Sequence, residues 1–379
     1  MRAMRWLGLT GAAVVLAGLT SAWVIATEHQ APPPHGVFAV RHPVAWSVST
    51  ARAPELRRDA LRRAQLRLAM PERPVLDLAV AEPPLTCRFL AKAPQGTTPK
   101  FDCVLDGGEV IKVKYGRDPE IPAEVAATRL LSALGFPADR MSIVSRLRCH
   151  GCPRYPFMAM RLIHFAGASA WFPPRGYEDG YSDFHWAAVE RKFSGVAIEA
   201  GDEEGWGWWE LDAIEPGVGA PAVDRDALRL LAAFLAHWDN KSSNQRLLCL
   251  DAPAGTDGRC GRPLAMVQDL GATFGPEKAD LGRWASSPLW DDKRACTISM
   301  RHLPYGGGTF GQARISEAAR LQVVRHLRSI PDDQVAGLFS AARFPEYYSG
   351  TDDRKVLAAW TAAFHTRVRH IIDAGPCPR

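Results

Sequence analysis

The chain has 379 residues, of which 47% are hydrophobic and 23% are charged, so it is long enough to bury one large core or two lobes. The formal net charge of +5 is mild and comes partly from arginines near the N-terminus, so it does not indicate nucleic-acid binding. The sequence contains no zinc-finger, helix-turn-helix or heptad pattern and no Gly-x-Ser-x-Gly elbow, which disfavours DNA-binding, coiled-coil and serine-hydrolase classes.

The N-terminus predicts export. Met1–Arg5 carries two arginines, and Trp6–Ala26 is an apolar run without a charge that ends in an acceptable cleavage site. The run is also about as long as a membrane span, roughly 20 residues. Residues 1–26 are therefore either a cleaved signal peptide or a membrane anchor. Pro32–Pro34 indicates a stiff spacer. The expected location is periplasmic, inner-membrane anchored or secreted.

The cysteines independently favour an oxidising compartment. There are eight, an even number, in four neighbourhoods. Cys149 and Cys152 lack the second ligand pair of a zinc site, and Pro153 stands where a c-type haem site needs His. Disulfides are therefore favoured over buried thiols and over a metal site. The neighbourhoods are Cys87 with Cys103, Cys149 with Cys152, Cys249 with Cys260, and Cys296 with Cys377.

Residues 27–84 form a Pro-rich and then Arg-rich preamble. Ala53–Met70 has helical composition, and its arginines are expected to form a solvated face. Residues 85–155 are expected to form an N-terminal lobe, residues 156–379 a C-terminal lobe, and Pro156–Arg161 a hinge between them.

The N-terminal lobe begins with a predicted hairpin. Asp106-Gly107-Gly108 separates two apolar runs and is typical of a tight turn. Strand alternation places Val110, Lys112 and Lys114 on one face. A helix is predicted over Pro122–Leu134 by its apolar spacing.

Two glutamates at the start of this helix are candidate partners for a strand lysine. Glu120 and Glu124 are four residues apart and share a face. Glu124 lies further inside the helix and is the preferred partner of Lys114.

An aromatic segment follows the expected hinge. Trp171–Trp209 is rich in Gly, Pro and aromatic residues, and Trp206–Leu211 reads Trp-Gly-Trp-Trp-Glu-Leu. Such a run is explained either by core packing, which is favoured, or by an aromatic platform for substrate.

The strongest motif follows a helix predicted over Asp224–His237. Asp239 is followed by Lys241 two positions later and by Asn244 five positions later, and Asp269-Leu270-Gly271 lies downstream. This is the layout of a protein-kinase catalytic loop and its metal-binding tripeptide. Each piece alone is weak, but the two occur in the expected order, each after an apolar run. Leu247–Leu250 and Leu264–Val267 are expected to form two strands between them.

The remainder of the expected C-terminal lobe is helical. Helices are predicted over Ser316–Leu327, Asp332–Ala342 and Asp353–Ala374. The fold class expected from all these elements is α+β, with a small β-rich lobe and an α-rich lobe.

On these motifs, residues 85–345 resemble the kinase-like superfamily in its atypical branches: HipA-type, phosphatidylinositol and secretory-pathway kinases. Gly96-Thr97-Thr98-Pro99-Lys100-Phe101 is similar to the phosphate-loop segment of the first two. The resemblance implies a two-lobed kinase-like fold with a nucleotide in the cleft. The implied roles are an acceptor-orienting base at Asp239 with Lys241 facing the phosphate, metal ligands at Asn244 and Asp269, and nucleotide binding by Lys114, Glu124, Lys112, Thr97 and Thr98.

The sequence departs from the usual pattern at two points. Trp238 stands where Arg is usual, which puts regulation by activation-loop phosphorylation in doubt, and 25 positions separate Asn244 from Asp269. His237 is expected to be a structural histidine, hydrogen-bonded to backbone, rather than a proton shuttle.

The expected activity is phosphoryl transfer from ATP, with Mg²⁺ or Mn²⁺, to a hydroxyl of a protein, lipid or glycan. Binding of nucleic acid is not expected. A catalytically silent binding module of the cell envelope is the alternative, because a bacterial periplasm holds little ATP. Transfer of a nucleotidyl group by the same residues also stays open.

Overall fold

The computed structural model describes residues 51–69, 72–79, 81–165, 180–201, 203–251, 258–304, 310–348 and 351–378. The predicted signal or anchor at 1–26 and the Pro32–Pro34 spacer lie outside these residues, as does part of the Trp171–Trp209 segment. Among the helices of the described residues, none is both long enough and apolar enough to span a membrane.

The described chain is a mixed α+β protein, as expected, and it divides into two compact units. The first unit comprises residues 81–118 and 144–190, and the second the described parts of 51–79 with 119–143 and 191–378. After residue 81 the chain therefore passes between the units at residues 118–119, 143–144 and 190–191. The segment expected to be a hinge, Pro156–Arg161, instead lies within a helix, α4 (Pro156–Phe165).

The sheet of the first unit is a closed five-stranded barrel. The strand order is β1-β2-β3-β5-β4, and β1 closes the barrel by pairing in parallel with β4. The turn at Asp106–Gly108 joins β2 and β3 in an antiparallel hairpin, as predicted, with Lys100 opposite Lys114. A barrel of this kind is not specific to kinases. The strands are β1 (Leu85–Leu90), β2 (Lys100–Leu105), β3 (Val110–Lys114), β4 (Arg140–His150) and β5 (Tyr181–Arg191).

The barrel has its own core and two disulfides. Alternate residues of β3, Ile111 and Val113, are fully buried in a cluster that also contains Phe101 and Val189. One disulfide joins Cys87 and Cys103 across β1 and β2, and the other joins Cys149 and Cys152. Both confirm the expected pairing.

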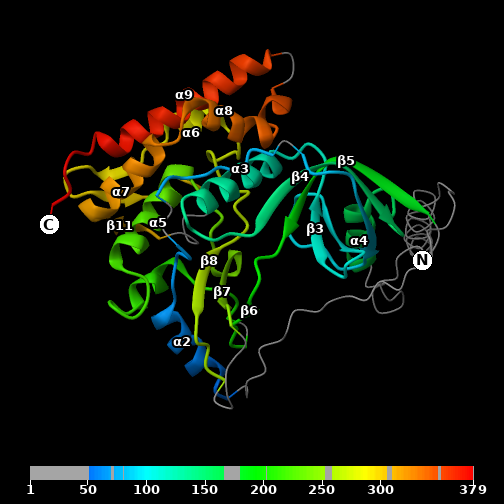
Figure 1. The fold of residues 1–379 in the computed structure, drawn as a ribbon, viewed down its shortest axis with the longest axis horizontal. Coiled ribbons are helices and arrows are strands. Elements are labelled where there is room, and N and C mark those ends of the chain that lie inside the picture. Colours follow the sequence, from blue (N-terminus) through cyan, green and yellow to red (C-terminus); the bar gives the residue numbers. More distant parts are fainter. Residues whose placement is uncertain are drawn as a thin grey trace, which may run out of the picture. The chain divides into compact units, whose positions relative to one another are not determined.

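The second unit contains every described α-helix except α4 (Figure 1). Helix α9, red in the figure, packs against α6, α7 and α8, and α5 packs against α7. Five predicted helices are confirmed with small shifts at their ends: α3 (Glu120–Ala133), α5 (Ala222–Leu235), α7 (Glu317–Arg328), α8 (Asp332–Ala341) and α9 (Asp353–Ile372). Helix α2 (Ala53–Arg63) is shorter than predicted, and α6 (Leu281–Ser286) was not predicted.

Aromatic side chains fill the centre of this unit. Trp360 of α9 lies 4.5 Å from Phe344 and 5.1 Å from Phe339 between ring centroids, and Phe274 lies 4.9 Å from Trp284. Most of these rings meet edge to face, a geometry favoured by the quadrupoles of the rings. The turn after the Asp269 tripeptide is therefore anchored in the core through Phe274.

A hairpin separates the two motifs of this unit, as predicted. Strand β7 (Gln245–Cys249) pairs antiparallel with β8 (Pro263–Val267), and β6 (Val196–Ala197) adds to the edge of β7. Cys249 and Cys260 form a disulfide beyond its far end, and Cys296 is joined to Cys377 near the C-terminus. All eight cysteines are thus paired. Four disulfides are compatible with an extracellular location.

The helix of the preamble has the predicted solvated arginines at Arg58 and Arg62, but Arg57 differs from the prediction. Arg57 is buried and donates to both carboxylate oxygens of Glu210 at 2.9 Å. The side chain of Arg67, beyond the helix, is only 6% exposed and lies 2.9 Å from Asp224. Paired guanidinium groups can be buried where single charges cannot. The sequence pattern of α2 did not show that Glu210, 153 positions away, would supply the partner.

The two disulfides of the second unit are expected to differ in their contribution to stability. They close loops of 11 and 81 residues. In the chain-entropy model the longer loop contributes about 2 kcal/mol more. Chemical denaturation in oxidising buffer should therefore show a larger loss for Cys296→Ala/Cys377→Ala than for Cys249→Ala/Cys260→Ala. An equal or reversed order would show that loop length does not govern their contributions.

Candidate functional site

The loop that carries Asp239 begins where helix α5 ends. Ala236 has a left-handed conformation, with φ of 52°, and terminates the helix. The next two residues are then fixed by backbone bonds, from the His237 amide to the carbonyl of Ala232 at 2.9 Å and from the Trp238 amide to Ala272 at 3.1 Å. The loop is thus held both by the helix and by the turn after Asp269.

Within the loop, a hydrogen bond to Asp239 orients the side chain of Asn244. Its Nδ2 donates to the backbone oxygen of Asp239 at 2.6 Å, and the side chain is buried. Because Nδ2 is used in this bond, Oδ1 is the atom available to a cation. The Lys241 ammonium lies 3.3 Å from the Asp239 carboxylate, and both side chains are partly exposed.

The hairpin brings Asn244 and Asp269 to one end of the same pair of strands. Gln245 is opposite Val267, so the residues just outside this pair lie at the open end of the ladder. The amide of Gln268 donates to the carbonyl of Asn244 at 3.2 Å, which continues the pairing by one step. The 25 positions between the two motifs therefore do not separate them in space.

Asp269 lies in a group of three carboxylates. One oxygen from each of Glu120, Glu124 and Asp269 lies within 4.8 Å of the other two. Asp269 has a left-handed backbone, with φ of 53°, a conformation that Asp tolerates better than most residues. The sequence predicted Asp269 as a metal ligand and noted the shared face of Glu120 and Glu124, but it did not place either glutamate beside Asp269.

Two further residues shape this carboxylate group. The ammonium of Lys278 forms an ion pair with Glu120. Gly271 is needed for space, because a Cβ at this position would lie only 2.2 Å from Cγ of Glu120. The glycine of the tripeptide thus allows a glutamate of α3 to approach the turn.

His237 is fully buried in the core and close enough to Asp239 and Asp269 to feel their charge. Burial lowers the pKa of His237 from 6.5 to about 4, although Asp269 and Asp239 oppose this shift. The imidazole is therefore neutral at neutral pH, so it does not serve as a cationic ligand for phosphate.

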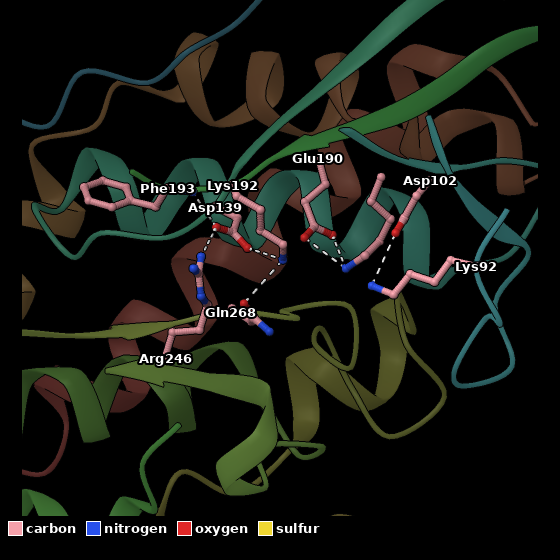
Figure 2. Close-up of polar contacts among 9 residues, drawn as sticks. Lys92, Asp102, Asp139, Glu190, Lys192, Phe193, Arg246 and Gln268 are labelled. Atoms are coloured by element: carbon pink, nitrogen blue, oxygen red, sulfur yellow. Dashed lines mark hydrogen bonds and ion pairs between the residues drawn. The ribbon is translucent and has the colours of Figure 1, made fainter. Parts of the chain in front are cut away.

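Asp139 organises a second polar network, which the sequence did not predict (Figure 2). Its nearly buried carboxylate accepts from the Lys192 ammonium and the Phe193 amide, each at 2.8 Å, and lies 3.4 Å from Arg246. Lys192 also reaches Gln268 at 3.4 Å. The network ties the segment after β5 to strand β7 and to the residue before Asp269.

In the first unit, Lys112 and Lys114 occupy different environments. Lys112 contacts both carboxylate oxygens of Glu190 at 3.0 Å, and Glu190 is buried (Figure 2). Lys114 is itself buried, with 1% of its surface exposed. A lysine buried to this degree is costly unless a defined polar environment holds it. The predicted pair of Lys114 with Glu124 joins residues of the two units and stays a prediction.

The segment compared with a phosphate loop also belongs to the first unit. Gly96 has a left-handed φ of 75°, and a Cβ there would lie 3.2 Å from the Lys100 ammonium. Thr97 is exposed, whereas Thr98 is fully buried and its hydroxyl has no hydrogen-bond partner among the described residues. Their nucleotide-binding role stays a prediction.

The carboxylate group fits a hard divalent cation. Carboxylate and amide oxygens are the ligands that Mg²⁺ and Mn²⁺ prefer, and the group together with Asn244 offers only such atoms. Three carboxylates this close repel one another when ionised, and a nearby cation reduces that repulsion. The second group of potential ligands, Cys249, Asp251 and Cys260, contains a disulfide and is therefore structural.

Comparisons with known proteins give little guidance. No protein-family profile and no curated protein matches the sequence. Among solved structures, the proinflammatory kinase CtkA of Helicobacter pylori is similar with a TM-score of 0.43 and 11% identity, over 77% of this chain and 96% of CtkA. A similarity of this size establishes neither a family nor an activity.

Gly271→Ala is expected to disturb the carboxylate group. The new methyl group would displace Glu120 from its place beside Lys278, with a loss of about 1 to 3 kcal/mol in the free energy of unfolding. Binding of Mn²⁺, followed by electron paramagnetic resonance, should weaken in parallel. Gly107→Ala is the control, because nothing lies within 4 Å of its Cβ position. Unchanged stability and Mn²⁺ binding in Gly271→Ala would contradict this account.

Proposed function

We propose that the chain is an exported phosphotransferase with a kinase-like fold that uses ATP and Mg²⁺ or Mn²⁺. The observation that carries the proposal is the arrangement in the second unit. The loop holding Asp239 and Lys241, the oriented side chain of Asn244, and Asp269 with its two glutamates meet around one hairpin end and one turn. These are the residue types that phosphoryl transfer requires.

The roles follow from the chemistry of each group. Asp239 orients the acceptor hydroxyl and accepts its proton, and Lys241 places positive charge beside the transferred phosphoryl group. Asn244 and Asp269, with Glu120 or Glu124 as neighbours, would hold the divalent ion, which neutralises phosphate charge when bound. Lys114 would contact the α and β phosphates, and Thr97 and Thr98 would lie along them.

Substitution of the metal ligand Asp269 should reduce ATP affinity, whereas substitution of the acceptor-orienting Asp239 should reduce phosphoryl transfer. Asp269→Asn should abolish the Mg²⁺-dependent part of ATP affinity, because phosphate charge then lacks its bridging cation. Asp239→Asn should bind ATP like the wild type while autophosphorylation falls by about 10²- to 10⁴-fold, the usual contribution of a general base. Calorimetry with and without Mg²⁺, followed by transfer of labelled phosphate from ATP, separates the two effects.

The controls for this experiment are built into the same measurements. Circular dichroism must show that both variants are folded. ATP binding by the wild type that needs no divalent ion would contradict the metal assignment. An intact wild type that binds ATP with Mg²⁺ but transfers neither phosphate nor AMP would favour the silent binding module. Transfer of AMP would indicate nucleotidyl transfer.

Lys112 and Lys114 provide a matched test on one strand. Lys114→Met should weaken ATP binding strongly, since the buried ammonium is the one assigned to the phosphates. Lys112→Met should mainly reduce stability, because it leaves the buried carboxylate of Glu190 without its ammonium partner. Calorimetry and thermal unfolding of both variants measure the two effects. Stronger loss of ATP affinity in Lys112→Met would move the role to that residue.

A further inference from the structure

The tryptophan-rich segment divides into a buried part and an exposed part. Trp206 and Trp208 are fully buried, whereas Trp209 exposes 61% of its surface. Core packing is therefore confirmed for Trp206 and Trp208, while an aromatic platform for substrate stays a prediction. Trp206 and Trp208 pack in the core, and Trp209 presents a large aromatic face to solvent from the 3-10 helix η2 (Trp208–Ala213).

The Trp209 ring lies beside a backbone segment that is held by hydrogen bonds. It lies against the backbone of Gly207, where a Cβ would come within 2.4 Å of the ring. The Gly207 amide donates to the Glu210 carboxylate at 2.7 Å, and Arg57 holds that carboxylate with two further bonds.

Trp209 borders a cavity of about 490 Å³ that lies entirely within the second unit. This volume is within the usual range for small-molecule sites. The cavity is lined on its aromatic side by Trp208, Trp209 and Phe310, and on its polar side by Asp212, Asp226 and Arg229. Phe310 packs on Trp208 with ring centroids 5.4 Å apart, so the aromatic side is continuous with the core.

Two buried donors in the cavity lining lack acceptors. The indole N–H of Trp208 and the Nε–H of Arg229 have no hydrogen-bond partner in the part of the chain that the structure describes. Both residues are more than nine-tenths buried and both line the cavity. Neither donor atom is accessible from the cavity, so recognition of a ligand depends on the exposed ring of Trp209 and the exposed carboxylate of Asp212.

The carboxylates of the cavity provide the complementary acceptors. Asp212 lies 2.8 Å from Arg229, and Asp226 accepts the Ser316 amide at 3.1 Å, so both side chains are oriented. The charged lining residues are Asp212, Asp226, Arg229 and Arg314, two acids and two bases. Their formal charges cancel. The cavity therefore has no net attraction for an anion such as phosphate or for a polyamine.

A neutral ligand with both donors and acceptors and with an apolar face matches this lining. We infer that the cavity binds a saccharide, with one sugar ring on Trp209 and its hydroxyls bonded to Asp212 and Arg229. Sugar hydroxyls both donate and accept, and the C–H face of a pyranose packs on an aromatic ring. This proposal does not rest on phosphoryl transfer.

The test uses the purified full-length protein on a microarray of neutral and N-acetylated oligosaccharides, followed by calorimetry with the oligosaccharide retained most strongly. Trp209→Ala should weaken binding about tenfold or more, and Trp209→Phe should restore part of it, because a smaller ring keeps part of the stacking surface. Gly207→Ala should weaken binding with the tryptophan still present. Trp186→Ala is the matched control, since Trp186 is also exposed but lies in β5 of the other unit.

The outcomes decide between this site and its alternatives. Retention of no oligosaccharide by the folded wild type would overturn the proposal, as would equal affinities of the wild type and Trp209→Ala. Tighter binding of inorganic phosphate or spermidine than of any saccharide would show that charge governs the cavity. Asp269→Asn should bind the saccharide like the wild type, so failure of the phosphotransferase proposal leaves this result unaffected.

Discussion

Hydrogen bonds to the last carbonyls of helix α5 hold together the core of the second unit and the loop that carries Asp239. The carbonyls of Phe234 and Leu235 can find no partners within the helix once Ala236 turns left-handed, and the Ala233 carbonyl keeps only the Ala236 amide, at 3.1 Å. Arg367 of α9 donates to Ala233 at 2.6 Å and to Phe234 at 3.2 Å, and the Phe274 amide donates to Leu235 at 2.7 Å. A fully buried guanidinium thus replaces the water that would otherwise solvate these carbonyls. Burial lowers the pKa of Arg367 to about 9, which still leaves it charged at neutral pH, where its charge complements the negative end of the helix dipole.

This arrangement links core stability to the candidate site. The same turn that supplies Phe274 to Leu235 also supplies Ala272 to the Trp238 amide, and Asp269 lies three residues before Ala272. Loss of the α5 cap would release the Asp239 loop and the carboxylate group together. The aromatic cluster around Trp284 and Trp360 strengthens the link, because the Trp284 indole also donates to Phe234 at 2.8 Å.

The sequence predicted local features well and long-range polar partners poorly. Helix periodicity predicted α5, α7 and α9, the hairpin β7–β8 followed from two apolar runs, and all four disulfides matched the neighbourhoods of the cysteines. Asp139, Glu190 and Arg367 were not predicted, because the partners of each lie tens of residues or more away and leave no periodic signal. The carboxylate group was predicted only in part. Glu120 and Asp269 meet because α3 packs beside the turn, a tertiary contact that the absence of a side chain at Gly271 permits.

The register of the β7–β8 hairpin determines where Asn244 lies relative to Gln268 and Asp269. Side chains alternate between the faces of a strand, so a slip of one residue would exchange every face and move Asn244 away from Gln268. The Cys249–Cys260 disulfide joins the chain just beyond the last pair, Cys249 with Pro263, and a slipped register would have to stretch that link. The insertion between the two motifs is therefore closed at one end by a covalent bond and at the other by the Asn244–Gln268 backbone bond. A separation of 25 positions in the sequence becomes a fixed spacing between Asn244 and Asp269.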